Sequence, residues 1–476
     1  MFTTTQFGAK FTFSLGSSVY AQQGRKENSV RSPKDIAKDL QAGRISRREF
    51  VQRAADGAFS LAATCSLLGQ VAQGQTKPSA SGHARNADQQ LHAASVDAGY
   101  DFNQTNLDPY AEWLKTEGIP VYREFAVADL RAIELKPWKR VGGLGAHVNL
   151  IGGEGVNTAY VCELPPGAAT NPQRYLFEET IYFLDGEGES QMWVPKGPKY
   201  SVQWKAGSVL GPPLNMWRRH INRGSKPARF LSVNNAPVVI DLFHNSDFVF
   251  NNDYVFRDRF DEAGDFLKSG DDQLHMKTVK SSDSSKGVYT FHGSFIPDAR
   301  TIGVKASASR GKGNSRIELE LSNNTMQTHI SEFSTGTYKM AHRHGPGSHV
   351  VTLNGQGYTL FWKGSTRYSD APEKKRVDWA DGSLTVPPDG WFHQHFNTGR
   401  DSARYIAPNW GGSGRWFMEG LGGGGYTHLL DSVDVKKGGN MVEYEDEDPQ
   451  VREMYVAELA KSGIKFNMDT KKRVSE

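Results

Sequence analysis

Short apolar runs separated by glycine and proline fill most of the second half of the chain and part of the first. A run such as 159–164 is rich in β-branched and aromatic residues, which is typical of strands. The runs fall into two stretches, 136–260 and 288–435, with a charged, serine-rich segment at 261–287 between them. This pattern predicts two β domains joined by a linker.

The flanking segments have different patterns. Residues 76–98 are polar and small, which predicts a linker. Residues 99–135 predict a short helical arm, and its apolar side carries Tyr110, Trp113 and Leu114. At the other end, residues 436–476 open with an acidic run, and 451–461 predicts an amphipathic helix that packs on a β domain.

The two β stretches share a spacing that indicates an internal repeat. In the first, Glu179 stands seven residues before Gly186, and in the second, Ser348 stands seven residues before Gly355. Further along each stretch, another glycine opens a strand that reaches a histidine. A duplicated small-barrel unit explains this arrangement.

Length, charge and cysteine content narrow the class of protein. A chain of 476 residues is long enough for two β domains with extensions, and its 50 glycines suit many tight turns. The formal net charge of +3 gives no electrostatic case for nucleic acid binding. The two cysteines, Cys65 and Cys162, exclude a disulfide framework.

Residues 1–75 have the features of a targeting segment. Residues 46–51 read Ser-Arg-Arg-Glu-Phe-Val, and a weakly apolar stretch follows at 54–72. These features resemble a twin-arginine signal, with a cleavage site among the small residues at 72–74. The resemblance implies the twin-arginine export machinery as a partner, a periplasmic or extracellular location, and no membrane span after signal removal.

Three histidines in the second stretch form the strongest chemical pattern. His342 and His344 are separated by one residue, so strand alternation places both on the same face. His393 follows a turn shaped by Pro388 and Gly390, which aims it at the same interior. Three imidazoles suit a divalent ion such as iron, zinc, nickel or copper. We therefore predict that these histidines are metal ligands.

The segments around these histidines resemble the two sequence motifs of the cupin superfamily. The matching positions are Gly336, His342, His344 and Gly355 in the first motif, and Gly382, Pro388, Gly390, His393 and Asn397 in the second. The resemblance implies an all-β bicupin, with two jelly-roll-like double-stranded β-helix barrels and short helical N- and C-terminal extensions. Barrel 1 would span 136–260 and barrel 2 would span 288–435.

Ser348 stands where most metal cupins carry a glutamate ligand. A histidine pair followed by a non-ligand resembles the gentisate and 1-hydroxy-2-naphthoate dioxygenases, which hold Fe(II) through three histidines. Three neutral ligands leave the full charge on the ion, so a chelating phenolic acid or dicarbonyl substrate can bind beside O₂. The resemblance implies an Fe(II) dioxygenase, with Mn, Ni, Zn and Cu as alternative metals.

Three further residues are candidates for the same site. His349 is a candidate fourth metal ligand if a bulge turns it inward. His395 shares the parity of His393 and is a candidate catalytic proton carrier, or else a hydrogen-bonded imidazole behind the ligands. Arg343 is a candidate catalytic group that would favour a carboxylate substrate, although a surface role is commoner for arginine.

The first barrel lacks the metal-binding residues. The matching positions hold Gln173, Tyr175, Glu179 and Arg218. An arginine would repel a metal ion, so we predict a structural barrel in which Arg218 pairs with Glu179. The alternative is a small-molecule pocket in which an anion is bound by Arg218, Arg219 and His220.

Two other functions stay open on the sequence alone. A metal-dependent isomerase, lyase or decarboxylase would use the same histidines without oxygen. A non-catalytic binding bicupin would need no stoichiometric metal. A small-molecule substrate is common to both enzyme interpretations, and a homo-oligomer is expected only by analogy with other cupins.

Overall fold

The computed structural model describes residue 44 and residues 108–153, 155–277, 288–307, 311, 313–410 and 433–468. The predicted export signal with Cys65, and the predicted linker at 76–98, lie outside the described residues. Within the described part of the chain, no helix combines the length and the apolar character needed to cross a membrane.

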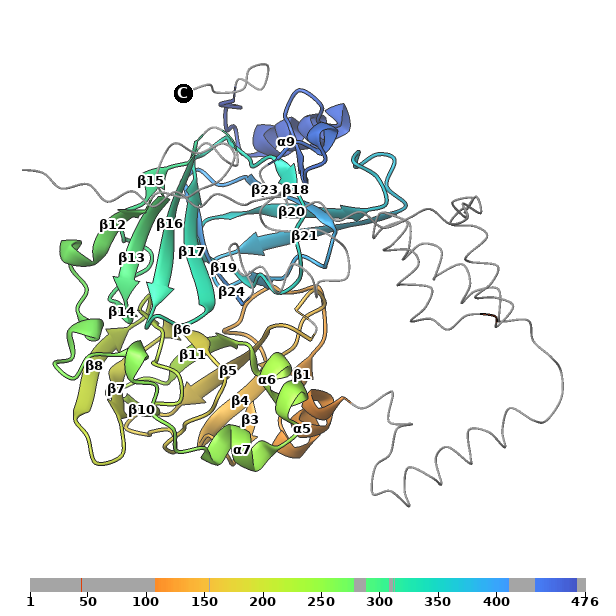
Figure 1. The fold of residues 1–476 in the computed structure, drawn as a ribbon. Helices are drawn as coiled ribbons and strands as arrows, with labels where there is room; N and C mark the ends of the chain where they lie inside the picture. Colours follow the sequence, from red (N-terminus) through yellow and green to blue (C-terminus); the bar gives the residue numbers. More distant parts are fainter. Residues whose placement is uncertain are drawn as a thin grey trace, which may run out of the picture. The chain divides into compact units, whose positions relative to one another are not determined.

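The first barrel consists of an eight-stranded sheet and a three-stranded sheet (Figure 1). The strands of the larger sheet are β1 (Val121–Tyr122), β3 (Lys136–Trp138), β4 (Gly143–Val148), β5 (Thr158–Leu164), β6 (Glu179–Asp185), β9 (Val209–Leu210), β11 (Ala228–Asn234) and β14 (Phe295–Ile296). The smaller sheet contains β7 (Glu187–Trp193), β8 (Lys199–Lys205) and β10 (Trp217–Asn222).

The second barrel consists of a nine-stranded sheet and a five-stranded sheet. The larger sheet contains β2 (Ala126–Val127), β12 (Leu274–Lys277), β13 (Val288–Gly293), β15 (Lys305–Ala306), β16 (Asn314–Leu321), β17 (Met326–Phe333), β19 (Val350–Asn354), β22 (Leu384–Thr385) and β24 (Ala403–Trp410). The smaller sheet contains β18 (Ala341–His342), β20 (Gln356–Lys363), β21 (Glu373–Ala380), β23 (Phe392–Asn397) and β25 (Met441–Val442). The fold is therefore all-β with two barrels, as the sequence predicts.

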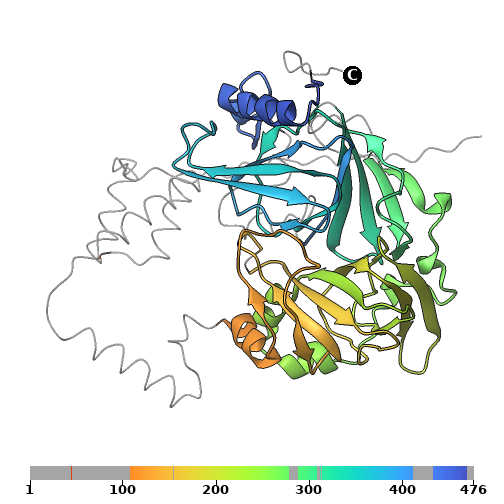
Figure 2. The same ribbon diagram turned by 180° about the vertical axis from the view of Figure 1, so that it is seen from behind.

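Helices cover the outer ends of the two barrels (Figure 2). They are α5 (Pro109–Glu117), α6 (Ala236–Phe243) and α7 (Ser246–Asn251) on the first barrel, and α9 (Pro449–Lys461) on the second. Short 3-10 turns are η1 (Arg257–Arg259), η2 (Asp265–Leu267), η3 (Asp271–Gln273) and η5 (Val435–Lys437). The predicted apolar side of the arm is buried in α5, and Val451, Tyr455 and Leu459 of α9 pack on the second barrel, as expected.

The helices α6 and α7 lie where the sequence pattern predicted only strands. Pro237 stands in the first turn of α6, where its missing N–H costs nothing. The side chain of Asn245 caps α7 by accepting a hydrogen bond from the Phe248 N–H. The proline position and the cap favour a helix here, although the apolar run by itself predicted a strand.

The internal repeat is visible in equivalent hairpins. Gly186 and Gly355 both have positive φ, at 85° and 99°, where a side chain would be strained. Two positions later, Gly188 and Gly357 lie under the rings of Trp204 and Trp379, and an added Cβ would overlap both the ring and a backbone oxygen. The hairpin that turns each barrel wall is thus built in the same way twice.

One buried apolar cluster spans the two barrels, and the barrels exchange short strands. A single buried cluster runs from Val148 and Val161 of the first barrel to Ile330 and Ile406 of the second. In addition, β14 comes after β12 and β13 of the second barrel yet pairs with β9 of the first, and β2, which precedes the first barrel's main strands, pairs with β22 of the second. The predicted boundary between the β stretches is therefore crossed in both directions.

Candidate metal centre

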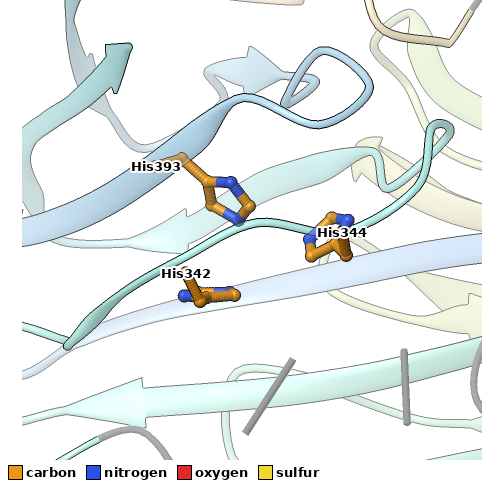
Figure 3. A group of neighbouring side chains, drawn as sticks. All are labelled: His342, His344 and His393. Carbon is orange, nitrogen blue, oxygen red and sulfur yellow. The ribbon is translucent and has the colours of Figure 1, made fainter. Parts of the chain in front are cut away.

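His342, His344 and His393 form a compact group inside the second barrel (Figure 3). His342 on β18 lies directly opposite His393 on β23 in the antiparallel register, and His344 follows in the loop after β18. One ligand atom from each ring lies within 4.8 Å of the others, and all three residues are buried. The structure thus brings together the three histidines that the sequence predicts as metal ligands.

The Nδ1 atoms of these rings face backbone carbonyl oxygens. The distances are 3.1 Å from His342 to Met340, 2.8 Å from His344 to Gly345 and 3.2 Å from His393 to Trp391. A carbonyl can only accept, so each Nδ1 carries the proton and the lone pair lies on Nε2. This tautomer presents the Nε2 lone pair to a metal, and the same carbonyl contacts fix the orientation of each ring.

The donor set consists of imidazoles alone. Among the described residues, no carboxylate or thiol joins the group. Ser348, at the position of the missing glutamate, is buried at 7% exposure. Three neutral nitrogen donors fit a borderline divalent ion, and they leave coordination positions for anionic oxygen ligands.

The predicted fourth ligand, His349, is not part of this group. Its Nδ1 lies 2.8 Å from the Gly347 carbonyl oxygen, and its ring faces Gly153 at the junction with the first barrel. Burial lowers the pKa of His349 to about 4, so the ring is neutral at pH 7. His349 lies at the end of the loop between β18 and β19, and its ring is directed away from the metal group.

His395 lies one alternation step from the ligand His393, with ring centroids 5.6 Å apart. Its Nδ1 lies 2.8 Å from the Thr359 hydroxyl. In the first barrel His220 makes the same contact with the Ser190 hydroxyl, at 2.7 Å on the equivalent pair of strands. Since that pair exists where the equivalent metal ligands are absent, the geometry favours a packing role for His395.

Arg343 lies between His342 and His344 in sequence but outside the group. Its guanidinium stacks over the Phe392 ring at 4.7 Å, and Nε donates to the Asn440 side chain at 3.2 Å. These contacts attach the C-terminal segment to the barrel. The catalytic role of Arg343 stays a prediction.

A buried ion pair occupies the equivalent position of the first barrel. Arg218 donates to Glu179 with an N–O distance of 2.6 Å, and both side chains are almost fully buried. The guanidinium also lies 4.0 Å from the Tyr175 ring centroid. Burial alone would raise the pKa of Glu179, but Arg218 and the Ser232 hydroxyl lower it, so the carboxylate is ionised. The predicted pair is confirmed, and it fills the place of a metal.

The alternative anion pocket of the first barrel does not form. Arg218 is committed to Glu179, Arg219 donates to Gln191, and His220 is held by Ser190. Burial lowers the pKa of His220 to about 4, so it carries no charge to offer an anion.

Sequence reasoning missed a buried lysine near the second barrel's site. Lys339 is 1% exposed, and its Nζ donates to the Ser331 and Tyr405 hydroxyls, both at 2.6 Å. Burial would raise the pKa of Tyr405, but the Lys339 ammonium group lowers it. The available signal is a lysine between Tyr338 and Met340, shortly before the two histidines that enter the barrel.

Comparison with known proteins finds similarity in fold only. No protein-family model and no curated protein sequence matches the chain. The formate complex of Lactobacillus farciminis oxalate decarboxylase is 12% identical with a TM-score of 0.39, over 60% of this chain and 85% of that one. A variant of Bacillus subtilis oxalate decarboxylase is 12% identical with a TM-score of 0.38, over 60% of this chain and 76% of that one. The reaction has to be inferred from the site itself.

Proposed function

We propose that this bicupin is an Fe(II)-dependent dioxygenase acting on a small chelating anion, either a phenolic acid or an enolised dicarbonyl. The observation that carries the proposal is the all-imidazole donor set of His342, His344 and His393. A bound divalent ion would supply Lewis-acid and redox chemistry. Manganese, nickel, zinc and copper are the alternatives that metal analysis would distinguish.

The chain's own contribution is to hold three rings in one orientation. Pairing of β18 with β23 sets His342 opposite His393, and the backbone carbonyls fix each tautomer. The group is buried, with His393 at 1% exposure, so competing water is limited. Neutral ligands favour an anionic substrate, because the three imidazoles leave the charge of the ion unbalanced and the substrate would offset it.

The first experiment is metal analysis of protein purified without added metal. We expect a single divalent ion per chain, lost in His393→Ala and kept in the exposed control His275→Ala. Iron-loaded protein should then consume oxygen with a member of a phenolic acid and dicarbonyl panel, and His393→Ala should slow this by on the order of 100-fold or more. Bound iron without oxygen uptake on any panel member would count against the dioxygenase.

Repeating the panel without oxygen separates the remaining functions. Turnover that persists anaerobically would indicate an isomerase, lyase or decarboxylase at the same three histidines. Protein that purifies without metal, and whose stability does not respond to a chelator, would indicate a non-catalytic binding bicupin.

We also propose that the chain is exported through the twin-arginine route, on the basis of Arg47 and Arg48 and the apolar stretch after them. Replacing both arginines by lysine should retain the protein in the cytoplasm in cell fractionation. A matched Arg44→Lys, Arg53→Lys variant should be exported normally. Equal export of both variants would exclude the route.

A further inference from the structure

A pocket inside the first barrel lies apart from the metal group and centres on His147 of β4. His147 is 2% exposed, and neither ring nitrogen has a hydrogen-bond partner among the described residues. Burial, and to a smaller extent the charge of Arg140, lowers the pKa of His147 to about 3, so the ring is neutral at pH 7. A neutral imidazole carries one donor and one acceptor, and leaving both unmet in a buried site is unfavourable.

Aromatic side chains form the walls of this pocket. Trp113 and Trp138 meet the His147 ring edge to face, with centroid distances of 5.4 and 5.3 Å. Tyr175 and Phe177 stack on each other at 3.7 Å along another side. Such walls suit a flat ring, and the two nitrogens of His147 suit a polar substituent on it.

The charges near the pocket are already balanced. Arg140 donates to the Glu117 carboxylate at 2.7–3.0 Å and to the Gln173 side chain at 2.9 Å. An anionic ligand would therefore have to displace an existing partner. The guanidinium also lies over the Trp113 and Trp138 rings, where it opposes a cationic ligand. The pocket consequently favours an uncharged molecule.

The phenol side chain of Tyr110 already occupies part of this pocket. Tyr110 of α5 is 4% exposed, and its hydroxyl donates to the Thr158 hydroxyl at 2.9 Å. The space left beside it is about 10 Å³, which is room for one water molecule. The helix is held at this end by a hydrogen bond from the Tyr110 N–H to Asp241, at the partly exposed edge of α6.

We propose that the first barrel is a second ligand site, which binds a small uncharged phenol against Trp138 and Tyr175 in exchange for the side chain of Tyr110. The ligand's hydroxyl group supplies a hydrogen-bond partner for a ring nitrogen of His147. This site is independent of the reaction proposed for the second barrel, because it shares no residue with the three-histidine group.

The test uses the full chain labelled with ¹⁵N-histidine and titrated with phenol, with toluene as the ring without a hydroxyl. We expect phenol to shift the His147 ring nitrogens saturably, and toluene to leave them unchanged. Tyr110→Ala should tighten phenol binding at least tenfold, since the internal competitor is removed. Isothermal titration calorimetry serves for the variants at this position: His147→Phe should weaken phenol binding at least tenfold, while the exposed control His275→Phe should not.

Other results would overturn the proposal. No saturable shift at His147, in either the parent or Tyr110→Ala, would show that the cavity holds only water. Equal binding of toluene would show an apolar void without polar recognition. Binding that is lost in His393→Ala but kept in His147→Phe would place the phenol at the second barrel. The shift in the parent protein needs no variant, so a misfolded variant does not block the test.

Discussion

Arg218 and His393 occupy the same place on equivalent strands of the two barrels. In one barrel a guanidinium is neutralised by Glu179 at 2.6 Å, and in the other an imidazole joins two more histidines. A buried ion pair contributes little net stability, because desolvation of both charges offsets their attraction. Its main effect is to fill a polar position inside the first barrel with two charges that neutralise each other.

Removing one member of this pair should therefore be costly. We expect Arg218→Met to lower the free energy of unfolding by about 3–5 kcal/mol, because the Glu179 carboxylate is left buried and uncompensated. Urea denaturation at pH 7 measures the change. The pair of half-exposed Arg223 with Glu189 supplies the control, since Arg223→Met leaves a carboxylate that water can reach and should cost less than about 1 kcal/mol.

A double replacement checks the reason for that loss. Arg218→Met with Glu179→Gln should recover most of the stability, because no unpaired charge remains. If the single and double variants were equally unstable, packing rather than charge would be the cause.

The three histidines of the metal site could be predicted from the sequence, because their spacing indicates which way their side chains point. An alternating pair and a histidine after a Pro–Gly turn converge in only one way on a barrel interior. The role of His395 was not accessible, since it depends on whether Thr359, a distant residue in sequence, faces it. The Lys339 contacts were missed for the same reason, because Ser331 and Tyr405 belong to other strands.

At the scale of elements, the C-terminal segment is attached to the metal-bearing sheet. Glu447 accepts hydrogen bonds from the Tyr338 hydroxyl at 2.5 Å and from the Gln394 side chain at 2.7 Å. Burial raises the pKa of Glu447 to about 7, although these two hydrogen bonds lower it. The segment before α9 thus contains a carboxyl group that titrates near neutrality.

This titration predicts the direction of a pH effect. The folded chain binds the proton more tightly than the unfolded chain, so Glu447 contributes stability below about pH 4.5 that is lost as the pH rises to about 7. A shift of this size corresponds to about 3 kcal/mol. The free energy of unfolding of Glu447→Gln, measured by urea denaturation, should therefore rise relative to that of the parent by roughly 2 kcal/mol between pH 5 and pH 8. The exposed control Glu445→Gln should track the parent, and a Glu447→Gln difference that stays constant with pH would contradict the assignment.

The repeated hairpin offers a second prediction at this scale. A Cβ at Gly357 would lie 1.9 Å from the Phe396 carbonyl oxygen and 2.6 Å from the Trp379 ring. We expect Gly357→Ala to destabilise the fold by about 1–3 kcal/mol and to loosen β20 against β23, with weaker metal binding as a result. Gly303→Ala has open space around the new methyl group and should change stability by less than about 0.5 kcal/mol in thermal melting. Metal affinity that is unchanged in Gly357→Ala would show that β23 holds its register without the close packing.

At the scale of the whole molecule, both barrels are expected to unfold together. The shared core includes residues from both barrels, and Glu178 of the first barrel accepts hydrogen bonds from the backbone N–H groups of Thr325 and Met326 in the second. The Thr180 and Thr328 hydroxyls are also hydrogen-bonded across the same junction, at 3.0 Å. Each barrel also has a hydrophobic cluster of its own, but these contacts and the shared cluster couple the two barrels.

Calorimetry of the full chain should accordingly show one transition, with the calorimetric and van't Hoff enthalpies in agreement. A chelator should move that whole transition to lower temperature, by an amount set by metal concentration and affinity, because the ion binds only the folded chain. Two separate transitions, with only one sensitive to the chelator, would show that the barrels are independent. The exposed-surface variant His275→Ala serves as the control for the chelator response.

The exchange of β2 and β14 decides how this chain can be cut. A fragment that ends at residue 260 would leave β9 without β14, and a fragment that begins at residue 288 would leave β22 without β2. Either half alone would expose an open sheet edge and part of a shared apolar face, which favours aggregation. A first half extended through residue 277 keeps β12, and together with the half from residue 288 it holds every complementary strand, so the two should reassemble as a split protein without a covalent link.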